Sequence, residues 1–338
     1  MLGRTFRRLT SAADLLRPTT FFRTLARVDQ VVDRTRELQR IVDSLQLRTE
    51  QLMTIERLDW EQRDELMRLP VLLDAPAIDA HVRAAVAAAP LELDPFPHVV
   101  VDRWLPADVY AAVIRGIPPS IFFADRDVSR QRLMVPFPLA PSYAQRVWRF
   151  VADEVVGRSL HAALNAKFRE VVLEHVRSFC PDVPPGLDLT LHPSDGRIML
   201  RRPGYVIAPH RDPKWGFVTG LVYLARKGDN EAYGTQLYRV SGDEEAPSAK
   251  PHYVDERRCT LVRSVPFRPN TLLAFLNSTG AHGASVPADA QPPALERYVY
   301  QFRLGPDAAT IKRLMALMPP ERRQMWMGAK SERAAYSS

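Results

Sequence analysis

The longest regular pattern in the chain is a heptad-like repeat of apolar residues between positions 31 and 69. This stretch contains no Pro or Gly and is rich in Arg, Glu, Gln and Leu, a composition that favours helix. Asp59 interrupts a series of apolar residues at intervals of seven, which is formed by Val31, Leu38, Leu45, Leu52 and Leu66. The fourth heptad position alternates between polar and apolar residues. The pattern predicts a long helix at 29–69, either a coiled coil or helical hairpin for self-association or a helix packed on the domain that follows.

Prolines divide the next part of the chain into shorter elements. The helical pattern is interrupted at Pro70, Pro76 and Pro90. We therefore expect a linker at 70–94, which contains the domain boundary and a short alanine-rich helix at 80–89. The run PFPHVVVD at 95–102 is typical of a strand, and helices are predicted at 106–114 and at about 143–179.

From residue 198 the pattern changes to short apolar runs separated by turn residues. The eight runs are GRIMLRRP, YVIAPH, FVTGLVYLA, GTQLYRV, CTLVRSVPF, NTLLAFLN, GASVP and ERYVYQFRLG. Eight short strands in about 110 residues predict a β-sandwich or barrel. Residues 307–338 are predicted to form a helical, basic tail. The expected fold class is α+β, with helices packed on the outside of a sheet.

Composition is consistent with one globular domain and an accessory segment. The chain has 338 residues, 46% of them hydrophobic and 25% charged, which is enough for a full-sized core. The two cysteines, Cys180 and Cys259, lie far apart without a second Cys or His at metal-ligand spacing, which argues against a disulfide scaffold and a zinc finger. We expect a reducing, cytoplasmic compartment. The longest uncharged run, 269–288, contains Pro, Gly, Asn, Ser, Thr and His, so no transmembrane helix is predicted.

Positive charge is concentrated at the start of the chain. The net charge is +7, and residues 1–28 hold six arginines against the single acid Asp14. The rest of the chain carries about +2, too little to predict a nucleic-acid partner. Three interpretations of the basic arm stay open: an organellar transit peptide, a helix for peripheral contact with a membrane or an acidic partner, and a lead-in to the long helix.

One group of residues suggests chemistry. His210 and Asp212 flank Arg211 at the end of a predicted strand, and alternate residues of an extended chain share a face. A carboxylate with two imidazoles supplies three ligands on one side of an octahedral Fe(II) and leaves positions open for substrate, dioxygen or water. His282 follows the apolar strand 270–277, and Arg297 opens the last strand. Taken alone, the pair could be a structural histidine at a turn that the acid caps, but four such residues on suitable strands favour a site.

The stretch from Met199 to Gly305 resembles the double-stranded β-helix core of the Fe(II)- and 2-oxoglutarate-dependent oxygenases, in particular the prolyl-4-hydroxylase-like branch. The family motif is His-x-Asp, a distal His and a basic residue on the final strand, which this chain matches in order with His210-Arg211-Asp212, His282 and Arg297. The flanking runs RRPGYVIAPHRD, TGLVYLA, GTQLYRV and RYVYQF agree, and PFPHVVVDRWL resembles the upstream strand and helix start. Roughly 210 residues are covered, most strongly the last 110.

The resemblance implies a role for each matched residue. His210, Asp212 and His282 would hold iron, and Arg297 would pair with the distal carboxylate of 2-oxoglutarate, because a guanidinium fork fits a carboxylate. Tyr223 matches a family tyrosine that bonds the same carboxylate. Three departures bear on the substrate: Gly234-Thr235 stands where the family often has Gly-Gly, an arginine at 201 or 202 replaces a common tyrosine, and the loop 241–258 is long and charged.

The implied fold is an oxygenase domain at 95–306, with a jelly-roll or cupin-like β-helix core at 198–305, flanking helices and an N-terminal long helix or coiled coil. The implied activity is that of a 2-oxoglutarate-dependent dioxygenase (hydroxylase), which hydroxylates an unactivated C–H bond with release of succinate and CO2. It would need Fe(II), 2-oxoglutarate and dioxygen, with ascorbate as a further candidate. A small molecule, a saccharide or lipid precursor and a protein side chain stay open as substrates.

Two other function classes compete with this interpretation. The chain could be a non-catalytic coiled-coil scaffold or binding protein with a degenerate jelly-roll domain, or a cupin-like metal-dependent isomerase or hydrolase. A scaffold would bind neither Fe(II) nor 2-oxoglutarate tightly, and only the oxygenase needs Arg297 for its cosubstrate. In each case a homo-oligomer is expected through the N-terminal helix.

Overall fold

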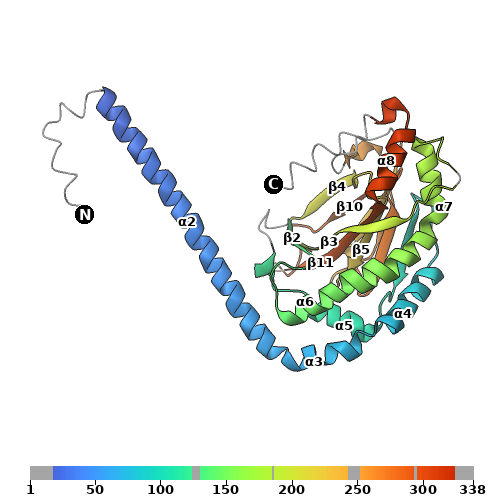
Figure 1. Cartoon of the computed structure of the whole chain (residues 1–338), viewed down its shortest axis with the longest axis horizontal. Helices are drawn as coiled ribbons and strands as arrows, with labels where there is room; N and C mark the ends of the chain where they lie inside the picture. The colour runs from blue at the N-terminus through green and yellow to red at the C-terminus, as the bar shows by residue number, and fades with distance from the viewer. Residues whose placement is uncertain (1–17, 124–129, 185, 243–251, 293–294, 324–338) are drawn as a thin grey trace. The chain divides into compact units, whose positions relative to one another are not determined.

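A computed structural model describes residues 18–123, 130–184, 186–242, 252–292 and 295–323 (Figure 1). The chain divides into two compact units, Met1–Arg57 and Leu58–Ser338. The predicted basic arm lies largely outside the described residues. In the part of the chain that the structure describes, no helix is both long enough and apolar enough to cross a membrane.

The predicted long helix exists, with different ends. Helix α2 (Pro18–Glu61) begins earlier than expected, and a turn at Gln62 separates it from α3 (Arg63–Leu72). Pro70, which was expected to end the helix, lies inside α3. In the last turn a proline removes a single backbone hydrogen bond, and Leu69 beside it is buried, so packing outweighs that loss.

The segment at 70–94, expected to be a linker with a short helix, lies within the compact second unit and contains a helix. Helix α4 (Ala75–Ala88) begins at Asp74, whose carboxylate accepts the backbone N–H of Ala77. Its buried residues are Ile78, Val82 and Val86. This spacing of four forms one apolar stripe, which packs against the long helical segment at 142–179. That segment consists of α6 (Ser142–Phe150), the π-helical η2 (Val151–Leu160) and α7 (His161–Phe179).

Within the described residues the strands form two antiparallel sheets. The six-stranded sheet has the order β1 (His98–Asp102), β9 (Thr271–Leu276), β5 (Val218–Tyr223), β11 (Arg297–Pro306), β3 (Leu191–Arg201) and β2 (Arg130–Met134). The five-stranded sheet has the order β7 (His252–Tyr253), β4 (Val206–Arg211), β10 (Ala281–Ser285), β6 (Thr235–Val240) and β8 (Cys259–Val265). Each of the eight predicted core runs overlaps one strand, whereas β2 and β7 were not predicted.

The hydrophobic core lies between the two sheets. Its buried residues include Phe96, Leu221, Leu237, Leu273 and Val299, drawn from both sheets and the segment before β1. The other face of the six-stranded sheet is covered by helices, as Figure 1 shows. Strand β11 is buried on both faces, so its alternate residues separate into two sets. The fold is α+β, with a jelly-roll, double-stranded β-helix core and flanking helices.

Residues on one face of β11 pack against the helices that cover the six-stranded sheet. The ring of Tyr300 packs on Trp148 of α6, with centroids 5.2 Å apart. The remaining helices of the second unit are α5 (Ala107–Arg115), in the predicted 106–114 region, and α8 (Ala308–Leu317), in the predicted tail. Short 3₁₀ turns complete it at η1 (Ser120–Phe122), η3 (Glu231–Tyr233) and η4 (Glu256–Arg258).

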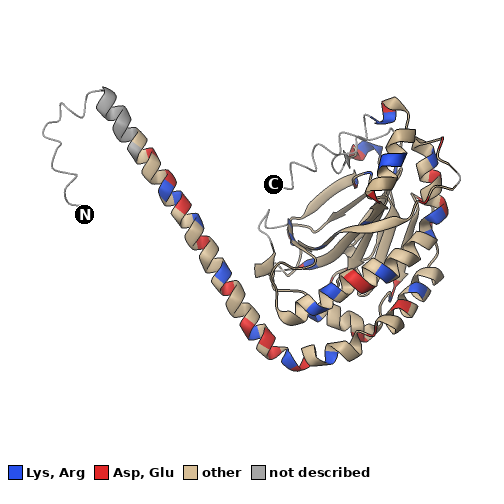
Figure 2. Ribbon diagram, viewed as in Figure 1, with Lys and Arg blue, Asp and Glu red and all other residues tan. Residues whose placement is uncertain are grey.

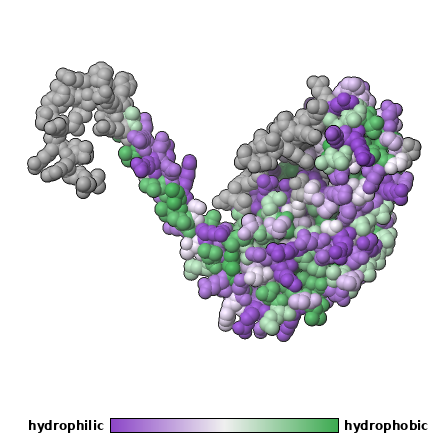
Figure 3. Space-filling view, viewed as in Figure 1, coloured by the Kyte–Doolittle hydropathy of each residue, from purple (hydrophilic) through white to green (hydrophobic). Residues whose placement is uncertain are grey.

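Helix α2 exposes the apolar series that suggested a coiled coil. Val31, Leu38, Leu45 and Leu52 are each at least half exposed. Acidic and basic residues occur along the same helix (Figure 2), and apolar residues are visible on its surface (Figure 3). A stripe of this kind becomes buried when a second such helix packs on it. We propose that α2 mediates self-association of the chain.

Light scattering on the full chain tests this proposal. The wild type is expected at a multiple of the 38.3 kDa monomer mass. Leu38→Asp with Leu45→Asp is expected to give the monomer, because it places charge in the seam. The matched control, Gln39→Asp with Gln46→Asp, adds the same charges one position along the heptad and should keep the wild-type mass. A monomeric wild type would contradict the proposal.

Candidate metal and cosubstrate site

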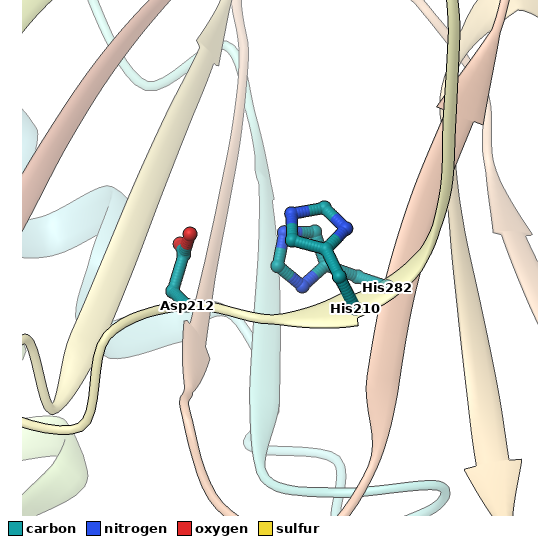
Figure 4. A group of neighbouring side chains, drawn as sticks. All are labelled: His210, Asp212 and His282. Carbon is teal, nitrogen blue, oxygen red and sulfur yellow. The ribbon is translucent and has the colours of Figure 1, made fainter. Parts of the chain in front are cut away.

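The centre of the site is a pair of histidines on neighbouring strands. His210 of β4 and His282 of β10 are direct cross-strand partners, and their ring centroids are 4.2 Å apart. Asp212 follows His210 by two residues, just beyond the end of β4. All three side chains are buried, and each offers a ligand atom within 4.8 Å of the others. Figure 4 shows the three side chains gathered on one side of the β4 and β10 backbones.

The protonation states of the three groups suit a divalent cation. Burial lowers the pKa of His210. Burial and the neighbouring His210 ring lower the pKa of His282 to about 3. Both imidazoles are therefore neutral at pH 7. His210 Nδ1 lies 3.0 Å from the Ala208 carbonyl oxygen. A nitrogen that donates to a carbonyl carries the proton, which leaves Nε2 as the ligand atom.

The Asp212 carboxylate is held by two side chains. Arg303 Nη2 donates to Oδ1 at 2.9 Å, and Thr219 Oγ1 donates to Oδ2 at 2.7 Å. Burial opposes the charged form of Asp212, but Arg303, the two imidazoles and Thr219 outweigh it and hold the pKa well below the ordinary value. The carboxylate is therefore ionised at neutral pH, and each oxygen retains a lone pair for a metal.

The backbone around Asp212 is fixed by residues from the strand before His282. Asn277, directly after β9, accepts the Asp212 N–H at 3.1 Å and donates to the Asp212 carbonyl oxygen. Arg211 Nε donates to the Gly280 carbonyl at 2.9 Å, which joins β4 to the turn that leads into β10. Gly280 itself is required there, because a Cβ atom would lie 1.8 Å from the Phe96 ring. The turn that presents Asp212 is thus bound to the segment that presents His282.

A second group of residues offers a buried cation for an organic anion. The guanidinium of Arg297 lies 4.6 Å from the Phe267 ring centroid and 5.8 Å from that of Tyr223. Burial lowers the pKa of Arg297 to about 10, so the group stays charged at pH 7. Within the described part of the chain, Arg297 Nε has no hydrogen-bond partner. Burial raises the pKa of the Tyr223 hydroxyl to about 12 despite its contact with Thr235, so this hydroxyl keeps its proton at pH 7. A buried, unsatisfied donor beside a protonated hydroxyl suits an anionic ligand.

These groups surround one cavity of about 230 Å³. His210, Asp212, His282 and Arg297 all line it, so the structure brings together four of the five predicted site residues. Tyr223 is fully buried behind the lining, where it touches Arg297. The cavity wall also contains β11 residues Val299, Gln301 and Arg303, which share the inward face of the strand with Arg297.

Sequence reasoning missed Arg303, Thr219 and Asn277. Arg303 had a signal in the sequence: it lies six residues after Arg297 in an otherwise apolar strand, so the same face carries both. Thr219 and Asn277 carry no such signal, since their roles depend on contacts with Asp212 across the fold.

Comparisons with known proteins add little to this geometry. No protein-family model matches the chain, and no curated protein matches its sequence. A prolyl-4-hydroxylase of Pseudomonas putida is similar in structure at 16% identity and a TM-score of 0.38, covering 67% of this chain and 100% of that one. HygX of Streptomyces hygroscopicus, with nickel, 2-oxoglutarate and hygromycin B bound, shows 14% identity and a TM-score of 0.37, covering 62% of this chain and 83% of its own.

A further similar structure is SnoN, a non-heme α-ketoglutarate-dependent epimerase from nogalamycin biosynthesis. It shows 14% identity and a TM-score of 0.38, and covers 68% of this chain and 83% of its own. At such identities and TM-scores the similarities do not identify an activity. The chemistry of this chain has to be inferred from its own residues.

Replacing Arg303 tests how the carboxylate is held. In Arg303→Gln the pKa of Asp212 should rise, because the main group that keeps it low is lost. The folded wild type keeps the carboxylate ionised far below pH 7, whereas in the variant metal binding should decline as the pH falls toward the raised pKa. Calorimetric titration with Ni(II) should show an affinity about 10–100-fold weaker, as for other groups that orient a ligand.

Arg303→Lys is the matched control, since it keeps the positive charge. It should retain most of the affinity and the flat pH profile of the wild type. Wild-type affinity and pH dependence in Arg303→Gln would show that Arg303 does not hold the carboxylate in its ligating state.

Proposed function

We propose that this chain is an Fe(II)- and 2-oxoglutarate-dependent dioxygenase that hydroxylates an unactivated C–H bond. One observation carries the proposal: two neutral imidazoles and an ionised carboxylate converge within 4.8 Å in a cavity that also contains the buried cation Arg297. Two histidines and one carboxylate on one side of a metal, with positions left open, are typical of non-heme Fe(II) oxygenases. The α+β jelly-roll fold agrees with this chemistry.

The residues fit the groups that the reaction needs. His210, Asp212 and His282 would hold Fe(II), and Arg297 would bind the distal carboxylate of 2-oxoglutarate through charge-assisted hydrogen bonds. The hydroxyl of Tyr223 would donate to the same carboxylate. With dioxygen, these bound groups supply the oxidising power: substrate, 2-oxoglutarate and O2 give hydroxylated substrate, succinate and CO2.

The residues around the site orient the ligands, balance buried charge and exclude water. Arg303 and Thr219 fix both oxygens of Asp212, so that the carboxylate presents one orientation to the metal. Phe275 packs on the His282 ring with centroids 4.6 Å apart, and Phe267 packs on Arg297, so apolar walls surround both anchors. Burying a guanidinium without an anionic partner is unfavourable. A bound dicarboxylate would supply that partner.

Removing the ligands tests the metal site. His210→Ala with Asp212→Ala should abolish Fe(II) binding and succinate formation, because one imidazole cannot hold the ion in place. Anaerobic calorimetry measures the first and succinate release in the presence of O2 measures the second. Full turnover in this double variant would refute the proposal.

Arg297 separates the oxygenase from other metal enzymes on the same fold. Arg297→Gln should raise the KM for 2-oxoglutarate about 100-fold, the effect of losing a paired charge-assisted contact, while Fe(II) affinity stays at the wild-type value. Arg268→Gln is the control, since Arg268 is exposed and pairs with Glu231. An isomerase or hydrolase would show no dependence on 2-oxoglutarate in the wild type, and a scaffold would bind neither Fe(II) nor 2-oxoglutarate.

A further inference from the structure

Two arginines lie opposite each other on β2 and β3, which form one wall of the cavity. Arg130 and Arg201 are direct cross-strand partners, so their side chains leave the sheet on the same face. Both stack on the ring of Tyr205, with guanidinium carbons 5.4 and 4.6 Å from the ring centroid. Like charges directly opposite on paired strands are destabilising. The Tyr205 ring offsets part of that repulsion, and an anion between the arginines would offset more.

Both guanidiniums are fixed in place by backbone carbonyls. Arg201 is buried, and its Nη1 donates to the carbonyl oxygens of Gln131 and Leu200, each at 3.1 Å. Arg130 is half-buried, and its Nη2 donates to the Val206 carbonyl oxygen at 2.9 Å. A carbonyl orients a guanidinium without neutralising its charge. The pair is therefore preorganised as a cationic surface.

Among the described residues that line the cavity, positive charges outnumber negative ones. Six arginines line it, and among the described residues that line it Asp212 is the acidic one. The six are Arg130, Arg132, Arg197, Arg201, Arg297 and Arg303. A concave site with apolar walls focuses such a potential. Bound Fe(II) and 2-oxoglutarate carry opposite charges of equal size, so loading the site would leave this imbalance in place.

We propose that Arg130 and Arg201 bind an oxyanion group of the substrate, a phosphate, sulfate or carboxylate. The inference rests on the proposed function, which makes this cavity the place where substrate meets the metal. It narrows the substrate class to anionic molecules. The cosubstrate would use Arg297 and the metal for its two ends. Arg201 is also the direct cross-strand partner of Arg297, so the oxyanion site on β2 and β3 would adjoin the cosubstrate site. Strand β2 is at the edge of the six-stranded sheet, beside the cavity.

Calorimetric titration of the full chain tests the proposal. The chain is loaded with Ni(II) and saturating 2-oxoglutarate, and inorganic phosphate is added at constant ionic strength. One saturable site is expected, with an affinity about tenfold lower in Arg130→Gln, the effect of losing one charge-assisted contact. Arg268→Gln, with its exposed arginine outside the cavity, should bind phosphate as the wild type does. Sulfate and acetate titrations then show whether a tetrahedral or planar anion fits better.

The outcomes separate this inference from the proposed function. Absence of phosphate binding by the wild type, or wild-type affinity in Arg130→Gln, would overturn the oxyanion site. So would phosphate binding that disappears in Arg297→Gln and survives in Arg130→Gln, since the anion would then occupy the cosubstrate site. If 2-oxoglutarate fails to bind while phosphate binding depends on Arg130, the oxyanion site stands and the oxygenase assignment falls. Arg130→Gln decides the test even if Arg201→Gln does not fold, because Arg130 is half-buried.

Discussion

The site depends on the pairing of β4 with β10. In an antiparallel pair, residues directly opposite each other point to the same face, so the register that opposes His210 to His282 places both imidazoles in the cavity. A shift of one residue would turn one of them to the other face. The Arg211 contact with Gly280 and the Asn277 contacts with Asp212 hold one end of the pair, and the register becomes irregular on the other side of His282, between His282 and Ala284. Register is thus the feature that brings three ligand atoms together.

Burial of charge is the second constraint on the site, and it explains why its charged side chains contact one another or aromatic rings. Asp212, Arg297 and Arg303 are all buried inside the sandwich, where an isolated charge is strongly unfavourable. Asp212 and Arg303 satisfy each other directly. Arg297 instead lies against two aromatic rings and has no acidic partner in the described part of the chain. The two arginines therefore differ in whether an acid of the chain itself balances their charge.

Much of the fold follows from local signals in the sequence. The eight core strands are bounded by turn residues, and the run at 95–102 and the helical pattern at 143–179 also correspond to elements. Strand β2 has the sequence RQRLM, in which charged residues alternate with few apolar ones, so nothing local indicates a strand. Strand β2 forms because this segment pairs with β3. At Pro70 the local pattern predicted a helix end that does not occur, because tertiary packing of Leu69 outweighs the helix-breaking preference of proline.

The candidate ligands could be predicted because their types and order form a motif, whereas their contacts with the groups that hold them could not. Arg303 contacts Asp212 across 91 positions of sequence, and no pattern links the two. The Arg130 and Arg201 pair likewise needs the β2–β3 register, which only the folded structure supplies. The sequence therefore predicted the candidate ligands, and the fold shows which side chains contact them and which charges line the cavity.

The most direct test of the central claim is a crystal structure of the full chain grown without oxygen in the presence of Fe(II) and 2-oxoglutarate. The account predicts a metal bound by His210, Asp212 and His282, with the distal carboxylate of 2-oxoglutarate on Arg297. A metal held elsewhere, or a 2-oxoglutarate molecule that leaves Arg297 without an anionic partner, would contradict it.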